Sequence, residues 1–458
     1  MNFSGGNLFD RGQEADMKED LTPKKIVEEL DRYIISQDEA KKSVAISLRN
    51  RHRRKNIEDN EMRSEITPKN IILIGSTGVG KTEIARRLAK IARAPFIKVE
   101  ATKYTEIGYV GNDVESIIKD LANIAHKQVR EERIEILKKE KYSLALERIA
   151  KIYKPYDTLN DAEKEKIIKE IEAGVHDNEE IEVTKTEKEN ENPHVIEVIG
   201  GNEPEDVENI LSNIMGSMKN LGDRGQKTVK MKISSAINHI LNEEVEQTIA
   251  GEDIISEVVE RVQEDGIVFI DEIDKIVERE DSSRGEVSRQ GVQRDILPIV
   301  EGCTVITKFG PIKTDHILFI AAGAFSQSSP SDIMPELQGR FPVKVKLENL
   351  QKEDFVKILT QVKYNLLEQY ETMLIQDNVQ LKFQKSGIDE IAELAIRFND
   401  KIENVGARRL HMILENLLRQ VMFEAPYEEM KKITIDRKYV SKVFKNEYEE
   451  ENLDKYIL

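Results

Sequence analysis

The sequence is short of the features that mark extracellular and membrane proteins. Its 458 residues contain one cysteine, Cys303, which excludes an intrachain disulfide and a zinc site built from several cysteines. A single cysteine is consistent with a structural thiol in a protein of a reducing compartment. No apolar run approaches the ~20 residues needed to span a membrane, and no signal peptide is recognisable. We therefore predict a cytoplasmic protein, with a polar, disordered extension at residues 1–20.

Positive charge is also in deficit. The net charge is −17, although 34% of residues are charged. A protein that binds nucleic acid over a large surface is expected to show the opposite balance. The basic run at residues 49–55 is the local exception, and a solvated helix end or a subunit contact explains it as readily as nucleic acid does.

The most informative stretch is residues 70–82. An apolar run, Ile71–Ile74, predicts a buried strand, and Gly75–Thr82 then matches the spacing G-x-x-x-x-G-K-[ST] of a phosphate-binding loop. Glycines allow backbone N–H groups to converge on phosphate oxygens, Lys81 reaches the β- and γ-phosphates, and the Thr82 hydroxyl binds Mg²⁺. A helix predicted from residue 82 to 92 directs its positive dipole end at the same anion. The pattern predicts a nucleoside triphosphate site.

A second buried strand ends in paired carboxylates. Residues 266–270 are apolar apart from a leading glycine, and Asp271 and Glu272 follow them. We expect this strand to lie beside the strand at 71–74, so that Asp271 comes close to Mg²⁺. Glu272 is then the candidate to accept a proton from the attacking water.

The rest of the pattern predicts an α/β protein with a helical insertion. Further strands are expected at residues 95–100, 316–325 and 343–347, and the chain is helical from about residue 348. Residues 130–200 are dominated by Glu and Lys, and we predict an inserted, mostly helical domain at 128–256. Within it, residues 179–192 are expected to form a mobile loop and residues 228–246 a helix.

Together these motifs resemble the AAA+ ATPases of the Clp unfoldase class, and within that class the HslU family. The resemblance covers about residues 18–458. Its carriers are Ile34, Ile35 and Gln37, Gly75–Thr82, Gly108–Gly111, Gly266–Lys275, Arg289–Arg294, Glu336–Pro342, Gly406–Leu410 and the Tyr456–Leu458 end. Two positions depart from the pattern: Ser36 stands where glycine is more usual, and Ala322 stands where many AAA+ proteins have a polar sensor of the γ-phosphate.

The resemblance implies an α/β AAA+ fold with a parallel sheet. It assigns residues 21–127 and 257–345 to a large nucleotide-binding domain, 128–256 to an inserted intermediate domain and 346–458 to a small α+β C-terminal domain. ATP and Mg²⁺ are the implied cofactors. No peptidase constellation is visible in the sequence, so proteolysis must come from a partner.

The resemblance also implies residue roles. Ile35 packs on the adenine, Thr82 and Asp271 serve Mg²⁺, and Arg408 senses phosphate. The phosphates are held by Gly78, Val79, Gly80, Lys81, Thr82 and Glu83. Glu336 and Arg340 act on the nucleotide of a neighbouring subunit. The substrate-gripping pore loop consists of Gly108, Tyr109, Val110 and Gly111, and the residues that dock on the peptidase are Tyr456, Ile457 and Leu458.

The implied function is ATP-driven protein unfolding by a homohexamer that threads substrates into an HslV-like peptidase and activates it. A ClpX-type unfoldase is the nearest alternative, although one cysteine excludes the zinc module usual in that group and the long insertion fits HslU better. A nucleic-acid motor or clamp loader is disfavoured by the negative charge and by the aromatic Tyr109 in an uncharged loop. A nucleotide-gated scaffold without hydrolysis is disfavoured by Glu272.

Overall fold

The computed structural model describes residues 22–104, 113–155, 160–186, 226–277 and 289–445. The chain divides into two compact units, one formed by Met1–Gln128 with Ile255–Leu458 and the other by Val129–Ile254. Among the helices of these ranges, none is both long and apolar enough for a membrane span.

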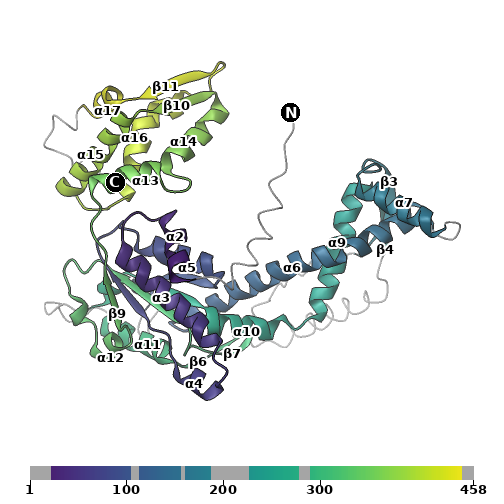
Figure 1. The fold of residues 1–458 in the computed structure, drawn as a ribbon, viewed down its shortest axis with the longest axis horizontal. Helices are drawn as coiled ribbons and strands as arrows, with labels where there is room; N and C mark the ends of the chain where they lie inside the picture. The colour runs from purple at the N-terminus through teal and green to yellow at the C-terminus, as the bar shows by residue number, and fades with distance from the viewer. Residues whose placement is uncertain (1–21, 105–112, 156–159, 187–225, 278–288, 446–458) are drawn as a thin grey trace, which may run out of the picture. The chain divides into compact units, whose positions relative to one another are not determined.

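A five-stranded parallel sheet organises the first unit (Figure 1). Its strands, in spatial order, are β2 (Phe96–Glu100), β5 (Ile267–Asp271), β8 (Leu318–Gly323), β1 (Ile71–Ile74) and β9 (Val343–Lys346). The central strands are buried almost throughout, as expected when helices cover both faces of a parallel sheet. The expectation that β5 lies beside β1 is wrong, because β8 pairs with both strands and separates them.

Helices precede the sheet strands and connect them. Thr22 caps the first helix by accepting a hydrogen bond from the Lys25 amide, and Pro23 opens it. The helices around the sheet are α2 (Pro23–Asp31), α3 (Asp38–Lys55), α4 (Asn60–Glu65), α5 (Lys81–Ala92), α10 (Ile254–Asp265), α11 (Arg289–Glu301) and α12 (Pro335–Gly339). The short strands β6 (Thr304–Thr307) and β7 (Gly310–Lys313) form an antiparallel hairpin.

The C-terminal residues of the first unit have a hydrophobic core of their own. Two parallel strands, β10 (Val379–Phe383) and β11 (Lys431–Ile435), pack with helices α13 (Lys352–Thr360), α14 (Leu366–Leu374), α15 (Lys385–Lys401), α16 (Arg408–Glu424) and α17 (Arg437–Val443). Helix α16 turns one apolar face to this core, and its members Leu410, Ile413, Leu414, Leu417 and Val421 are all buried.

The second unit is built on long helices. Helix α6 (Ser116–Tyr153) starts in the first unit and runs for 38 residues, and α9 (Ile233–Gly251) lies beside it in Figure 1 and shares its core. Helix α7 (Asp161–Glu172) adds to this core. Two sequence predictions are wrong here. Residues 180–186, expected in a mobile loop, form strand β3 (Glu180–Thr186), which pairs with β4 (Gln226–Lys232), where the start of a helix was expected.

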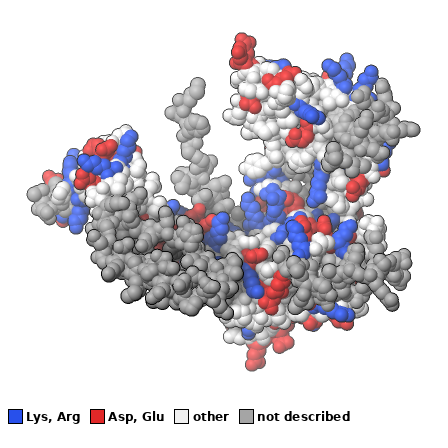
Figure 2. Space-filling view, turned by 180° about the vertical axis from the view of Figure 1, so that it is seen from behind, with Lys and Arg blue, Asp and Glu red and all other residues white. Residues whose placement is uncertain are grey.

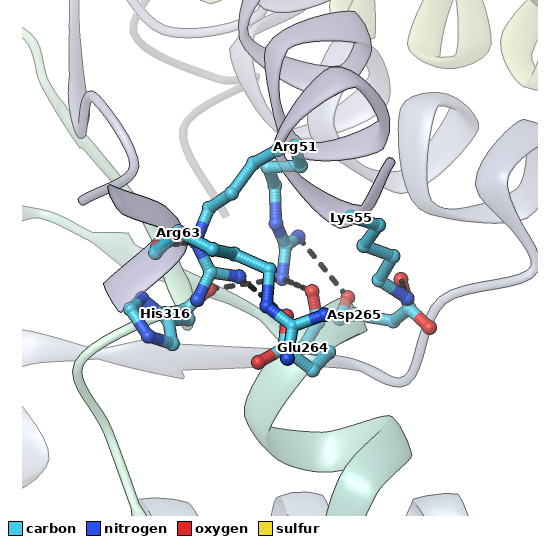
Figure 3. A network of polar contacts seen from close by, with 7 residues as sticks. Arg51, Lys55, Arg63, Glu264, Asp265 and His316 are labelled. Carbon is cyan, nitrogen blue, oxygen red and sulfur yellow. Dashed lines mark hydrogen bonds and ion pairs between the residues drawn. The ribbon is translucent and has the colours of Figure 1, made fainter. Parts of the chain in front are cut away.

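The basic run of residues 49–55 is largely structural. The Arg51 guanidinium donates to the carbonyls of Glu264, Asp265 and His316 at 2.6, 3.1 and 3.1 Å (Figure 3). Lys55 pairs with the Asp265 carboxylate at 2.7 Å. Burial lowers the pKa of Arg51 to about 10, which leaves it charged at neutral pH. The cation therefore satisfies the last carbonyls of α10, immediately before β5 begins.

Candidate active site

The phosphate-binding loop lies between β1 and α5, as predicted. Gly78 and Gly80 have φ angles of +77° and +105°, which favour glycine. The Lys81 ammonium is buried and donates to the carbonyl oxygens of Gly75 and Ser76 at 2.5 and 2.8 Å. Burial lowers the pKa of Lys81, and the Asp271 and Asp274 carboxylates oppose that effect. The Gly75 and Ser76 carbonyl oxygens thus hold the lysine at the loop, in the place where it would bind a phosphate.

Asp271 faces the start of α5 although its strand is not adjacent to β1. Its Oδ2 accepts a hydrogen bond from the Thr82 hydroxyl at 3.3 Å and pairs with the Lys98 ammonium at 2.8 Å. The intervening strand β8 ends in Ala322 and Gly323, which carry no polar side chain between Asp271 and the phosphate loop. One hydroxyl and one carboxylate, completed by phosphate oxygens and water, are a usual Mg²⁺ ligand set, so these residues fit that ion.

Glu272 is presented by an unusual backbone conformation. Its φ angle is +56°, in the left-handed region that non-glycine residues rarely adopt. The Glu272 amide donates to Asp271 Oδ1 at 3.1 Å, and the side chain is exposed in the cavity beside the phosphate loop. Backbone strain of this kind tends to occur at functional sites.

The phosphate loop is in backbone contact with the segment that leads into α16. The Ala407 amide donates to the Gly78 carbonyl at 3.1 Å, and a Cβ at Gly78 would clash with the Val405 carbonyl. A Cβ at Gly406, whose φ is +57°, would lie 2.6 Å from the Gly78 carbonyl oxygen. Both positions therefore require glycine, and the sequence did not reveal this contact.

The same segment separates the roles of two adjacent arginines, Arg408 and Arg409. Arg409 is buried and donates to the Glu403 carbonyl at 2.8 Å and to Asn399 Oδ1 at 3.3 Å, so it is structural. Arg408 is exposed and lines the cavity at the phosphate loop, and its charge helps to lower the pKa of Lys81. Arg408 is therefore available to an anion.

These residues surround one cavity of about 560 Å³ within the first unit. Of the predicted nucleotide residues, it brings together Ile35, Gly78, Val79, Gly80, Lys81, Thr82, Glu83, Asp271, Glu272 and Arg408. Burial alone would raise the pKa of Glu83, but hydrogen bonds from Arg87 and Arg86 outweigh this effect and lower that pKa.

The pore-loop residues 108–111 and the docking residues 456–458 lie outside the described residues.

Glu336 and Arg340 do not line this cavity. Both are exposed, and Arg340 pairs with the Glu301 carboxylate at 2.7 Å. The buried Asn70 side chain donates to the Arg340 carbonyl at 3.0 Å, which fixes this backbone beside β1. Within one chain, the two residues are therefore not part of the nucleotide site.

Several cavity residues were missed by the sequence reasoning. Asp274 accepts a hydrogen bond from the Phe325 amide at 3.2 Å and, with Ser326, provides polar groups close to Ala322, where a polar sensor is absent. The sequence did contain a signal for Asp274, since this carboxylate follows the Asp271–Glu272 pair by two positions.

Ser36 adopts a φ of +56°, which explains why glycine suits that position, and its hydroxyl donates to Asp354 at 2.6 Å.

Comparisons with known proteins agree with this geometry. The family described as "ATPase family associated with various cellular activities (AAA)" matches residues 71–220, and the "AAA domain (Cdc48 subfamily)" matches residues 182–356. The ATP-dependent protease ATPase subunit HslU of Persephonella marina (strain DSM 14350 / EX-H1) is 48% identical over 456 residues, or 96% of this chain and 100% of that protein. The chain belongs to the HslU family. As an HslU-family member it is an AAA ATPase that binds ATP. The predicted fold class, an α/β AAA+ fold with a parallel sheet, a helical insertion and a small C-terminal α+β part, is confirmed.

Proposed function

We propose that the chain is an ATP-dependent protein unfoldase and translocase that works with a separate peptidase. The observation that carries this proposal is one cavity that holds Lys81, Asp271, Glu272 and Arg408, in a chain that matches a protease ATPase subunit over 96% of its length. In this proposal Lys81 and Arg408 stabilise the charge on the transferred phosphoryl group, and Glu272 accepts the proton of the attacking water.

We propose Mg²⁺ as the metal, held by Thr82 and Asp271. Thr82 and Asp271 would hold the ion, which would supply positive charge against the charge that develops on the phosphates. The Lys98 ammonium pairs with Oδ2 of Asp271, the same oxygen that accepts the hydrogen bond from Thr82. This pairing helps to keep the Asp271 carboxylate oriented toward α5.

The working form in this proposal is a homohexamer with an HslV-like peptidase. Glu336 and Arg340 are exposed away from their own cavity, which suits residues that act on the nucleotide of a neighbouring subunit. An arginine supplied in trans is worth ~10³–10⁵ in rate in well-studied cases. Mixing Arg340→Ala subunits with Lys81→Ala subunits is therefore expected to restore some ATPase activity.

The remaining assignments are proposals about segments outside the described residues. Tyr109, flanked by Gly108 and Gly111 with Val110, grips the polypeptide in the central pore, and the Tyr456–Leu458 end docks on the peptidase. Six tails on one ring bind with avidity beyond that of a single tail. We also propose the domain division 21–127 with 257–345, 128–256 and 346–458, and a cytoplasmic site of action.

A nucleic-acid motor is less well supported. Arg51 and Arg54, the buried cations of the basic run, are taken up by acceptors of their own unit. On the face drawn in Figure 2, Lys and Arg are interspersed with Asp and Glu over the described residues. The described residues on that face therefore do not form an extended basic stripe of the kind that phosphate backbones require.

The test measures ATP turnover and casein degradation with and without an HslV-like peptidase. The proposal expects ATPase activity from the chain alone, and degradation only with both proteins and ATP present. Glu272→Gln should bind ATP yet support no degradation. ATP-independent degradation at the full rate, or stimulation by DNA in place of protein, would overturn the proposal.

A further inference from the structure

Tyr364 combines a strained backbone with an unpacked aromatic ring. Its φ angle is +58°, and the residue is 68% exposed. For a bulky side chain the left-handed region is a genuine outlier, which costs free energy and persists only when its surroundings enforce it. The ring has one close charged neighbour, the Lys363 ammonium, 5.3 Å from the ring centroid.

The contacts on both sides of Tyr364 hold this conformation. The Lys363 amide donates to the Arg32 carbonyl at 2.8 Å, and the Gln369 side chain donates to the Tyr364 carbonyl at 2.7 Å. Asn365, which is buried, caps α14 by accepting a hydrogen bond from the Glu368 amide at 3.1 Å. The backbone is therefore fixed while the ring itself stays unpacked.

These contacts place Tyr364 at the nucleotide cavity. It lines that cavity together with Ile34 and Ile35, and the Lys363–Arg32 hydrogen bond ties its loop to the residues just before them. Tyr33, the other aromatic residue of the lining, is already covered by the Arg87 guanidinium at 3.7 Å from its ring centroid. Tyr364 is thus the tyrosine of this lining whose ring is accessible to a ligand.

We propose that the Tyr364 ring packs on the nucleobase of ATP and closes the cavity at the end opposite the phosphates. An aromatic ring offers a planar apolar face. Stacking a nucleobase on such a face strengthens nucleotide binding and does not depend on the hydrogen-bonding groups at the edge of the base. This inference rests on the proposed ATPase function and deepens it, because it assigns a binding residue for the base half of the substrate.

The expected effect is on affinity rather than on chemistry. Base stacking on an aromatic residue predicts a loss of about 5- to 150-fold in ATP and ADP affinity when the ring is removed. The affinity for inorganic tripolyphosphate should not change, because that probe contacts only the phosphate loop. At saturating ATP, kcat should stay within about twofold of the unmodified protein, because the ring does not contact the reacting atoms.

The test is isothermal titration of the full chain with ADP, ATP and tripolyphosphate, together with thermal unfolding. Tyr364→Phe keeps the ring and should bind as the unmodified protein does. Tyr364→Ala and Tyr364→Asn should both weaken ADP binding, although asparagine tolerates the left-handed backbone and should not lower the melting temperature. Phe423→Ala removes a ring that is 83% exposed on α16 and outside the cavity lining, and it serves as the matched control with unchanged affinity.

Unchanged ADP affinity in Tyr364→Ala would overturn the inference. An equal loss of tripolyphosphate affinity would overturn it as well, because the residue would then act through the phosphate loop. If the unmodified chain bound neither nucleotide, the proposed ATPase function would fail first, and that result is distinct from both outcomes.

Discussion

At the scale of single residues, the account depends on charged groups that converge on the phosphate loop. Lys81 donates to two loop carbonyls, and Glu272 is exposed in the cavity on a strained backbone. Lys81→Ala should abolish ATP binding. Glu272→Gln should retain ATP binding but lose turnover by about 10²–10³, since a proton acceptor is removed. Nucleotide titration and phosphate release measure the two effects, and normal turnover in Glu272→Gln would contradict the assigned base.

The adjacent pair Arg408 and Arg409 gives a second prediction at this scale. Arg408→Met should lower ATPase activity with little change in melting temperature, because its side chain is exposed in the cavity. Arg409→Met should destabilise the protein by about 1–3 kcal/mol, because the Glu403 carbonyl and Asn399 lose their donor. Thermal unfolding and steady-state ATPase assays separate the two. A reversed pattern would mean that the two roles are exchanged.

The residues that could be predicted are those whose chemistry depends on local spacing. Gly75–Thr82 and the Asp271–Glu272 pair are recognisable because a phosphate needs backbone amides, a lysine and a carboxylate at fixed separations. The choice between Arg408 and Arg409 depends on which side of a helix start is buried, and this is set by contacts with Asn399 and Glu403. The glycine requirement at Gly78 arises from residue 405, far away in the sequence.

At the scale of elements, α3 is joined to the end of α10 by a buried cation. Arg51→Met should lower the free energy of unfolding by about 2–4 kcal/mol, because the carbonyls of Glu264, Asp265 and His316 lose their donor. Arg53→Met, two positions on, is the matched control and should change stability by less than about 0.5 kcal/mol, since Arg53 is exposed. Denaturant unfolding without nucleotide measures both. Equal effects would show that the buried contacts are not stabilising.

A pH-dependent cluster lies in the second unit, between α7 and β3. The His176 ring contacts the carboxylates of Glu179 and Glu170 at 2.7 and 3.3 Å, and these hydrogen bonds raise the pKa of His176 above 6.5. The hydrogen bond from His176 in turn lowers the pKa of Glu179 below 4.5. A raised histidine pKa stabilises the fold below pH 6.5 and loses that contribution as pH rises through the folded value.

Amide hydrogen exchange in β3 and α7 tests this cluster. After correction for intrinsic rates, protection should fall as pH rises above 6.5 and passes through the raised pKa of His176, where the ring loses its proton. His176→Asn should remove the dependence. The matched control His411→Asn, outside the second unit, should preserve it. Protection that stays level from pH 6 to pH 8 would count against the cluster.

Element types were predictable where apolar periodicity was strong, and they failed where it was weak. The sheet strands and α16 have continuous or helical apolar patterns, and their placement follows from burial. Strand β3 carries apolar side chains only at Ile181 and Val183, and its partner β4 lies about 45 residues further on. The order of β5, β8 and β1 could not be read from the chain, because sequence order does not fix spatial order in a parallel sheet.

At the scale of the whole molecule, ATP turnover should be coupled to substrate movement through Tyr109. Tyr109→Ala should keep basal ATPase activity and lose degradation of folded substrates, because an aromatic side chain grips any polypeptide through apolar contact. Tyr142→Ala, which removes an exposed tyrosine of α6, is the matched control and should degrade normally. Unfolding that persists unchanged in Tyr109→Ala would contradict the pore assignment.

The central claim is that ATP hydrolysis in the cavity around Lys81 drives protein unfolding into a partner peptidase. The most direct measurement is the rate of ATP-dependent degradation of a stably folded fluorescent protein by this chain with an HslV-like peptidase. The account predicts loss of fluorescence with ATP, and none with ADP or with the Glu272→Gln variant. Degradation of the folded substrate by Glu272→Gln at the rate of the unmodified chain would contradict it.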